Sequence, residues 1–493
     1  MIPRQSTTGA PLREGAGVAR NASFLVAGQV ATAAISFAVT AVLARNLGAQ
    51  DYGVFYLAAT LVQSAFVLAD FGQEYYVVGR IAKDASGVAT LLGTGLMLRL
   101  VGAIAIYLSL ACLAAVLDYP EVTRAAISLT IIFFLLSSIL QGVTIVLRGL
   151  ERMDLEVVLR VASKTLVAVA IGLAVISGGR LTAVLVTQIL GAAGAVIVCW
   201  FTVQRVGMAR PRLSLPTAVS ILSGGAPFLL WGVVVNSQSG IDALLLSVLA
   251  PPSVIGWHGA AWKLVGMLIF PANVLSAALY PTLSRLYGSA KYGGLLEDAL
   301  RAMVLVGFLT AAGTYLFADT AIALIYGTDV FGPAASNLRL LAVYMPLVFV
   351  DIILGAAIMA ARTLTPWILA KLGSVLVAAG VSVVLIPLSQ SSLGNGGLGC
   401  AAGTVAAELV MLVAGLFLVP VDRVRLAVKL SKDIGRGATA AAAMAVAAWM
   451  TRDAQLLASM AIAVTAYFAS VCLLGGIRRE DVRLVTDVVR GTR

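Results

Sequence analysis

Four ionisable side chains interrupt long apolar stretches between residues 206 and 420 of this 493-residue chain. Asp242, Lys263, Asp351 and Glu408 each lie well inside a run of hydrophobic residues. A charged group at the centre of a membrane-spanning helix costs about 2.5–3.5 kcal/mol, so each one needs a partner or a function. Their side chains have the chemistry to hold a proton, bind a cation or attract an anionic ligand.

Asp242 and Lys263 fall in two consecutive apolar runs joined by a short Pro-containing turn. Counted from that turn at 1.5 Å per residue, both lie roughly 12–15 Å below the same membrane surface. Two interpretations follow. The residues form a structural ion pair that holds the hairpin together. Alternatively, Lys263 attracts an anionic substrate group and Asp242 holds the lysine in place.

Asp351 and Glu408 have no partner that the sequence assigns. They are expected either to line a polar cavity as protonated or proton-coupling acids, or to hydrogen-bond to a neighbouring helix. Arg99 lies in an apolar run nearer the other face of the membrane. It either extends its side chain to the membrane surface or helps to collect a phosphate group at the mouth of a cavity.

The elements that position these residues are membrane-spanning helices. The chain is 60% hydrophobic and only 12% charged, whereas soluble domains are about half apolar and a quarter charged. A helix needs about 20 apolar residues to cross a bilayer. On that basis the sequence predicts an all-α protein with about fourteen spans: 21–44, 53–72, 96–117, 123–147, 156–178, 181–203, 226–249, 255–282, 299–318, 337–361, 366–388, 397–420, 437–451 and 455–475.

A weak internal repeat groups these helices into two halves. The pair Phe-Leu at 24–25 recurs at 228–229, and the glycine at 28 recurs at 232. Duplicated halves with a site between them are common in transporters. The predicted organisation is listed here by residue range: an N-terminal tail (1–20), an N-lobe of six helices (21–205), a C-lobe of six helices (206–420), a basic linker with a terminal helix pair (421–476) and a C-terminal tail (477–493).

The net charge of +11 reflects membrane orientation rather than a nucleic-acid partner. With the N-terminus inside, 28 of the 34 Lys and Arg residues fall on the cytoplasmic side and five on the outer side, with Lys263 inside a helix. This asymmetry predicts that both termini are cytoplasmic. The first apolar run, 21–44, is too long for the core of a signal peptide and lacks a convincing cleavage site, so we expect it to be a retained first helix. The basic residues separate apolar runs and do not form a patch with aromatics, so no nucleic acid is expected.

The sequence gives no sign of a cofactor or an enzyme active site. The four cysteines are scattered and the chain has one histidine, so no metal site is expected. The glycine-rich segment at 394–399 lacks the strand that a dinucleotide fingerprint requires. All loops are short, which leaves no room for the large periplasmic loop typical of polysaccharide polymerases and ligases.

Several short motifs follow one another along the chain in a recognisable order. The segment Leu43–Phe55 (LARNLGAQDYGVF) is followed by Ala69–Gly72 (ADFG) and Leu147–Met153 (LRGLERM). Further along are Asp242–Leu246 (DALLL) and Tyr280–Arg285 (YPTLSR). Together these motifs resemble the polysaccharide flippases of the MOP (multidrug/oligosaccharidyl-lipid/polysaccharide) superfamily, in which LAR-LG-x-x-x-YG-x-F joins the first two helices.

The resemblance implies a two-lobed, MATE-like fold of fourteen helices that works by alternating access in the bacterial inner membrane. It also implies a substrate, an undecaprenyl-pyrophosphate-linked oligosaccharide flipped to the periplasmic leaflet for O-antigen, capsule or exopolysaccharide. The implied partners are that substrate, membrane lipids, a polysaccharide polymerase and a chain-length regulator. A small-molecule or drug antiporter of the same fold is the alternative, and a polymerase or ligase is a more distant one.

Overall fold

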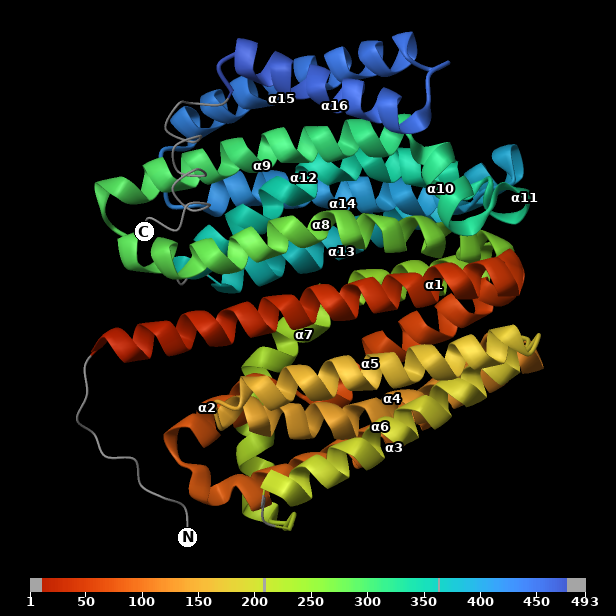
Figure 1. Cartoon of the computed structure of the whole chain (residues 1–493), viewed down its shortest axis with the longest axis vertical. Coiled ribbons are helices and arrows are strands. Elements are labelled where there is room, and N and C mark those ends of the chain that lie inside the picture. Colours follow the sequence, from red (N-terminus) through yellow and green to blue (C-terminus); the bar gives the residue numbers. More distant parts are fainter. Residues whose placement is uncertain (1–10, 207–209, 362–363, 477–493) are drawn as a thin grey trace. The chain divides into compact units, whose positions relative to one another are not determined.

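The structure is a computed structural model that describes residues 11–206, 210–361 and 364–476 (Figure 1). Most of these residues are helical and none of them is in a β-strand, which confirms the predicted all-α class. The predicted C-terminal tail (477–493) and the first ten residues of the N-terminal tail lie outside the described residues. The helices are α1 (Pro11–Asp70), α2 (Gln73–Lys83), α3 (Val88–Val116), α4 (Glu121–Gly149), α5 (Met153–Ile176), α6 (Leu181–Val206), α7 (Leu215–Leu249), α8 (Pro252–Leu286), α9 (Ala290–Leu316), α10 (Ala318–Tyr326), α11 (Thr328–Phe331), α12 (Ala334–Ala360), α13 (Leu364–Leu393), α14 (Gly397–Leu418), α15 (Arg423–Met450) and α16 (Leu456–Leu473), with one 3₁₀ turn at Ala85–Gly87.

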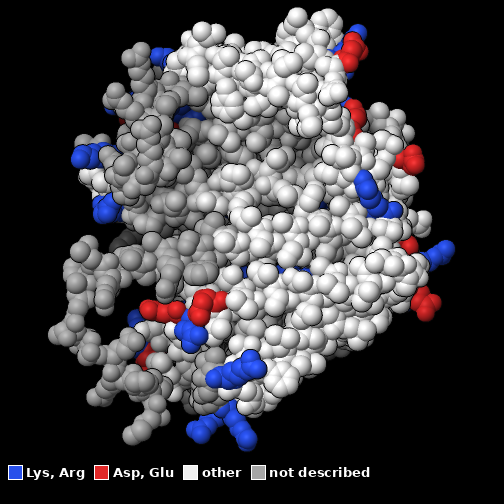
Figure 2. All heavy atoms as spheres, in the orientation of Figure 1, with Lys and Arg blue, Asp and Glu red and all other residues white. Residues whose placement is uncertain are grey.

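Twelve helical segments within the described residues are long and apolar enough to cross a membrane. The first of them, Ala27–Lys83, contains both the first and second predicted helices. Helix α15 is absent from the twelve because its first turns carry many charges, although its 28 residues are long enough to span. The first of the twelve spans contains two predicted helices and therefore counts as two. With α15 added, the total is the fourteen membrane-spanning helices that the sequence predicted. Figure 2 shows mostly uncharged side chains between the helix ends, as a lipid-facing surface requires.

The long helix α1 is divided at Gly48, where the backbone leaves the helical conformation (φ 71°, ψ 173°). The chain reverses direction near this point (Figure 1). These dihedral angles are favourable only for glycine because a Cβ atom would clash with the backbone. Gly48 therefore turns one 60-residue element into two helices, each short enough to cross the bilayer.

The chain divides into two compact units, Met1–Gly240 and Ile241–Arg493. The boundary falls inside α7, whereas the predicted lobes meet at 205–206. The first part of α7 packs within the first unit, where Tyr76 and Ser220 share a hydrogen bond. The segment before α7 is also held there, because the Arg212 N–H donates to the Ala89 carbonyl over 2.9 Å.

Within the first unit, glycines allow helices to approach closely. A Cβ atom on Gly93 would lie 2.4 Å from the Arg212 carbonyl oxygen, and one on Gly225 would lie 2.2 Å from the Phe71 carbonyl oxygen. Both distances are shorter than any van der Waals contact, so only glycine fits at these positions. The close packing brings the start of α7 against the end of α1, and this junction forms one wall of the cavity described below.

The second unit is built around α12, the most enclosed of the apolar spans. Helices α8, α9 and α14 pack around it. The terminal pair, α15 and α16, packs on α9 through a small apolar cluster that includes Leu305, Met444 and Tyr467. The Tyr467 hydroxyl donates to the Leu305 carbonyl over 2.5 Å, which ties α16 to α9. The short helices α10 and α11 occupy a segment for which the sequence predicted a loop.

We predict that Gly48→Ala lowers the stability of the protein by about 1–3 kcal/mol, because alanine is strained at this backbone conformation. The measurement is thermal unfolding of the purified protein in detergent. Gly79→Ala is the matched control, since Gly79 is helical and has open space where the Cβ would lie. An unchanged melting temperature for Gly48→Ala would show that the turn tolerates a side chain.

Candidate substrate cavity in the first unit

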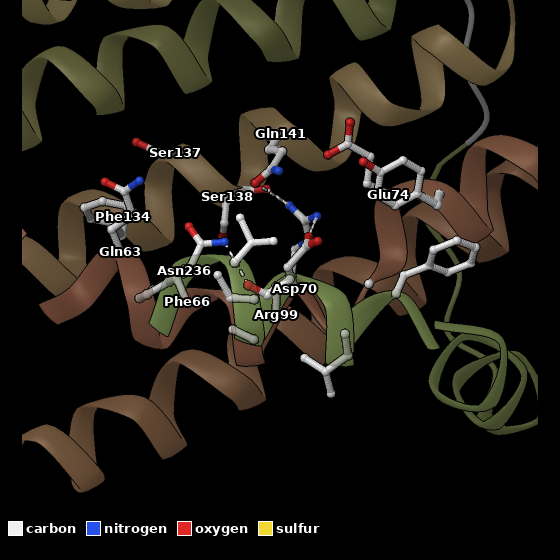
Figure 3. A pocket seen from close by; sticks show the side chains of 18 of the residues that line it. Gln63, Phe66, Asp70, Glu74, Arg99, Phe134, Ser137, Ser138, Gln141 and Asn236 are labelled. Carbon is white, nitrogen blue, oxygen red and sulfur yellow. Dashed lines mark hydrogen bonds and ion pairs between the residues drawn. The ribbon is translucent and has the colours of Figure 1, made fainter. Parts of the chain in front are cut away.

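The first unit contains a cavity of about 620 Å³. Its walls come from α1, α2, α3, α4, α5 and α7, and all its lining residues belong to this unit. The lining combines amides and hydroxyls with aromatic rings and four charged side chains (Figure 3). The residues of interest are Gln63, Phe66, Asp70, Glu74, Arg99, Phe133, Phe134, Ser137, Ser138, Gln141, Lys164, Trp231 and Asn236.

Arg99 on α3 is the most enclosed charged residue of this cavity, with 2% of its side chain exposed. Its guanidinium group donates to the Asp70 carboxylate and to the Ser138 carbonyl oxygen, the latter over 2.7 Å. Longer contacts reach the amide oxygens of Gln73 (3.4 Å) and Gln141 (3.5 Å). The interpretation that Arg99 extends to the membrane surface is therefore wrong: its side chain points inward, where four acceptors replace water.

Asp70 is positioned by a strained turn at the end of α1. Phe71 and Gly72 both have positive φ angles, of 48° and 67°. Such a conformation is unfavourable for phenylalanine and persists only where packing enforces it. Here the packing is the close approach of Gly225 to this turn. The ADFG motif thus places the carboxylate where Arg99 can reach it.

A second ionic network lies beside the cavity and holds α2, α4 and α5 together. Glu156 on α5 is fully buried and accepts from both Arg148 and Arg160. Arg148, from the LRGLERM motif, also binds Glu74, which lines the cavity. Because Arg148 pairs with Glu74, the charge of that cavity carboxylate is already matched.

Lys164 on α5 is the cavity cation without a carboxylate partner in the part of the chain that the structure describes. Its side chain is exposed to the cavity space. The charged group that acts on it most strongly is another cation, Arg160. Asp70 is matched by Arg99 and Glu74 by Arg148, so Lys164 leaves the cavity with one excess positive charge.

Two of the acids predicted in the second unit, Asp351 and Glu408, lie together near Lys371, a residue that the sequence did not single out. The Lys371 ammonium on α13 is 4.0 Å from the Glu408 carboxylate on α14. Glu408 is buried, and its carboxyl group and that of Asp351 on α12 face each other. Asp351 and Glu408 therefore do have partners, which no local signal in the sequence could reveal.

Asp242 and Lys263 lie in different surroundings. Asp242 is buried on α7, and its carboxyl group faces Cys400 and Thr404 of α14. One of its two oxygens has no hydrogen-bond partner among the described residues. Lys263 on α8 has an exposed side chain. Whether these two residues act as a structural pair or as a substrate site stays a prediction.

A polar cavity among membrane-spanning helices, in a chain built almost entirely of such helices, is the architecture of a polytopic membrane protein. Residues 18–287 match the family described as polysaccharide biosynthesis protein, which covers more than half of the chain. The chain therefore belongs to this family of MOP-superfamily flippases, as its motifs predicted.

Solved structures share the fold. A structure of the lipid II flippase MurJ in an inward closed conformation matches with a TM-score of 0.65 and 14% identity, covering 91% of this chain and 98% of that one. An inward-facing multidrug resistance MATE family transporter of the MOP superfamily matches with a TM-score of 0.57 and 16% identity, covering 81% and 95%. An outward-facing MATE structure gives 0.52 and 15% identity, covering 84% and 96%. The comparison with curated protein sequences returned no match.

We predict that Asp70→Asn lowers the free energy of unfolding by about 3–5 kcal/mol, because it leaves the buried Arg99 guanidinium group without its carboxylate. Arg99→Gln should cost less, because the Asp70 side chain that it leaves unpaired is 24% exposed. The double variant should cost less than the sum of the two, since it removes both charges together. Chemical denaturation in detergent measures all three values. Strictly additive losses would show that the two residues do not stabilise each other.

Proposed function

We propose that this protein is a flippase for undecaprenyl-pyrophosphate-linked oligosaccharide repeat units. It moves them from the cytoplasmic to the periplasmic leaflet of the inner membrane by alternating access, for assembly of O-antigen, capsule or exopolysaccharide. The observation that carries the proposal is the cavity of the first unit with its single excess cation, Lys164. Family membership supports the same conclusion.

The lining of this cavity suits a glycan joined to a phosphate. Sugar hydroxyls donate and accept hydrogen bonds, which the amides of Gln63, Gln141 and Asn236 can satisfy. Sugar rings also have apolar faces that pack on aromatic side chains such as Phe134 and Trp231. The volume of about 620 Å³ lies within the usual range of about 300–1,000 Å³ for small-ligand sites.

Lys164 is the group best suited to meet the phosphate. A flexible ammonium group binds phosphate as a point charge and carries three donors. Arg99 is less available because Asp70 already neutralises it and four acceptors surround it. Arg99 then acts as a positioning residue that holds α1, α3 and α4 in the geometry of the cavity, while Lys164 contacts the substrate.

The acids of the second unit support coupling of this transport to an ion. We propose that Asp351 and Glu408 exchange a proton, because two facing carboxyl groups cannot both carry charge at low cost. Lys371 would stabilise the form that carries one negative charge. Lys263 and Asp242 remain candidates for a second contact with the anionic head group.

If proton exchange by Asp351 and Glu408 drives transport, collapse of the proton gradient in membrane vesicles should abolish transport.

The decisive experiment compares a strain lacking this protein with its parent. Undecaprenyl-linked glycans are extracted, and their leaflet is determined in spheroplasts. We expect repeat units to accumulate on the cytoplasmic face and surface polysaccharide to be lost. Accumulation on the periplasmic face would indicate a polymerase or ligase instead. No accumulation, together with new sensitivity to small cationic toxins, would indicate an antiporter.

In the complemented strain, Lys164→Gln should reduce flipping by about tenfold or more, the value of one charge-assisted hydrogen bond. Lys164→Arg should restore most of it, because arginine keeps the charge. Neither should lower the melting temperature, since Lys164 has no carboxylate partner to lose in the described structure and lies near another cation, Arg160. Lys83→Gln on α2 is the matched control, being exposed and outside the cavity. Unimpaired flipping by Lys164→Gln would exclude its role.

The proposed orientation places both termini in the cytoplasm and the loop between α15 and α16 in the periplasm. In a background without the four native cysteines, Ala454→Cys in that loop should react with an impermeant maleimide in intact spheroplasts. Ser289→Cys, between α8 and α9, should react only after permeabilisation. Labelling of both positions, or of neither, in intact spheroplasts would contradict this orientation.

A further inference from the structure

A second pocket, of about 310 Å³, lies between α9 and α15 in the second unit. It is far more charged than the cavity of the first unit, since seven of its eight lining residues are ionisable. These are Glu297, Asp298 and Arg301 from α9 and Lys429, Lys432, Asp433 and Arg436 from α15. Nothing in the proposed flipping step uses this pocket.

Its carboxylates are already matched by cations. Glu297 pairs with Arg425 over 3.1 Å and also with Lys429, so two cations share one negative charge. Two further ion pairs follow along the pocket. On α9, Asp298 pairs with Arg301 over 3.6 Å. On α15, Asp433 pairs with Arg436 over 2.8 Å.

Lys432 is the fourth cation of the pocket lining. It has an exposed side chain and no ion pair within the described residues. Four cations and three carboxylates therefore line the pocket. The excess of one positive charge matches the charge of one phosphodiester group.

Exposed apolar residues follow this charged pocket along α15, towards its apolar end. Val446 and Met450, one turn apart on this helix, are 57% and 73% exposed. The ligand that matches a cationic pocket beside exposed hydrocarbon carries both an anionic head and acyl chains.

The length of α15 places the pocket at the level of lipid head groups. Its 28 residues extend about 42 Å, whereas the hydrocarbon core of a bilayer is about 30 Å thick. The apolar part of α15 lies towards its end at Met450, so the charged first turns project beyond the core. Basic pockets at this depth between helices are known to bind anionic lipid head groups.

We propose that the pocket between α9 and α15 binds the phosphate of an anionic glycerophospholipid, with its acyl chains directed along α15 towards Val446 and Met450. The lipid joins α9 to the terminal helix pair, in addition to the Glu297 ion pairs and the small apolar cluster that already hold them together. It therefore acts as a structural ligand of that pair.

The test uses the purified full chain and two diacyl lipids that differ only in head-group charge, phosphatidylglycerol and phosphatidylcholine. Native mass spectrometry counts retained lipids, and thermal unfolding measures stabilisation. We expect more phosphatidylglycerol than phosphatidylcholine to be retained, with a higher melting temperature. Lys432→Gln should weaken phosphatidylglycerol binding about fivefold, the effect of one basic residue near a charged lipid surface, and Lys432→Glu should weaken it further.

Lys432→Arg should bind as the native protein does, and Lys83→Gln on α2 controls for a general loss of positive charge. Lys432 has no partner to lose, so these variants should fold normally. Equal binding of both lipids, or undiminished phosphatidylglycerol binding by Lys432→Glu, would overturn the proposal. Equal stabilisation by inorganic phosphate alone would assign the pocket to a free anion and overturn the lipid assignment.

Discussion

A charge removed from water must be matched by an opposite charge or by hydrogen bonds, and this requirement determines where the ionisable side chains of the spanning helices lie. In the first unit, a residue on a different helix supplies the opposite charge. Arg99 on α3 pairs with Asp70 at the end of α1, and Arg148 on α4 pairs with Glu156 on α5. Each pair joins two helices that apolar packing alone would leave free to slide, so the shape of the cavity depends on them.

Glycine provides the second condition, because cross-helix pairs form only if the backbones come close enough. Gly225 allows α7 to reach the turn after Asp70, and Gly72 in that turn leaves room for the approach. A side chain at either position would separate the helices and move the carboxylate away from Arg99. The ADFG motif is thus explained by geometry: the aspartate supplies charge and the glycine supplies space.

The helices were predictable from the sequence because a bilayer imposes a local rule, about 20 apolar residues per span. That rule fails where a helix is charged at one end: α15 begins at Arg423, fourteen residues before the predicted start at 437. The rule on span length also does not predict which charged residues pair with each other. Asp70 is 29 residues from Arg99 in the chain, and Lys371 resembles any other basic residue near a helix end. Pairing depends on which helix faces are neighbours, which a single sequence does not encode locally.

The same electrostatic requirement separates residues that hold the structure from residues free to act. A paired ion such as Arg99 has little affinity left for a ligand, because binding would require it to give up contacts of similar strength. An unpaired ion in a membrane protein is tolerable only where water reaches it, and so it must line a cavity or a surface pocket. Lys164 and Lys432 are both exposed cations of this kind, one in each unit. The ion pairs around each of them match the neighbouring charges, so each lysine carries the positive charge that those pairs leave over.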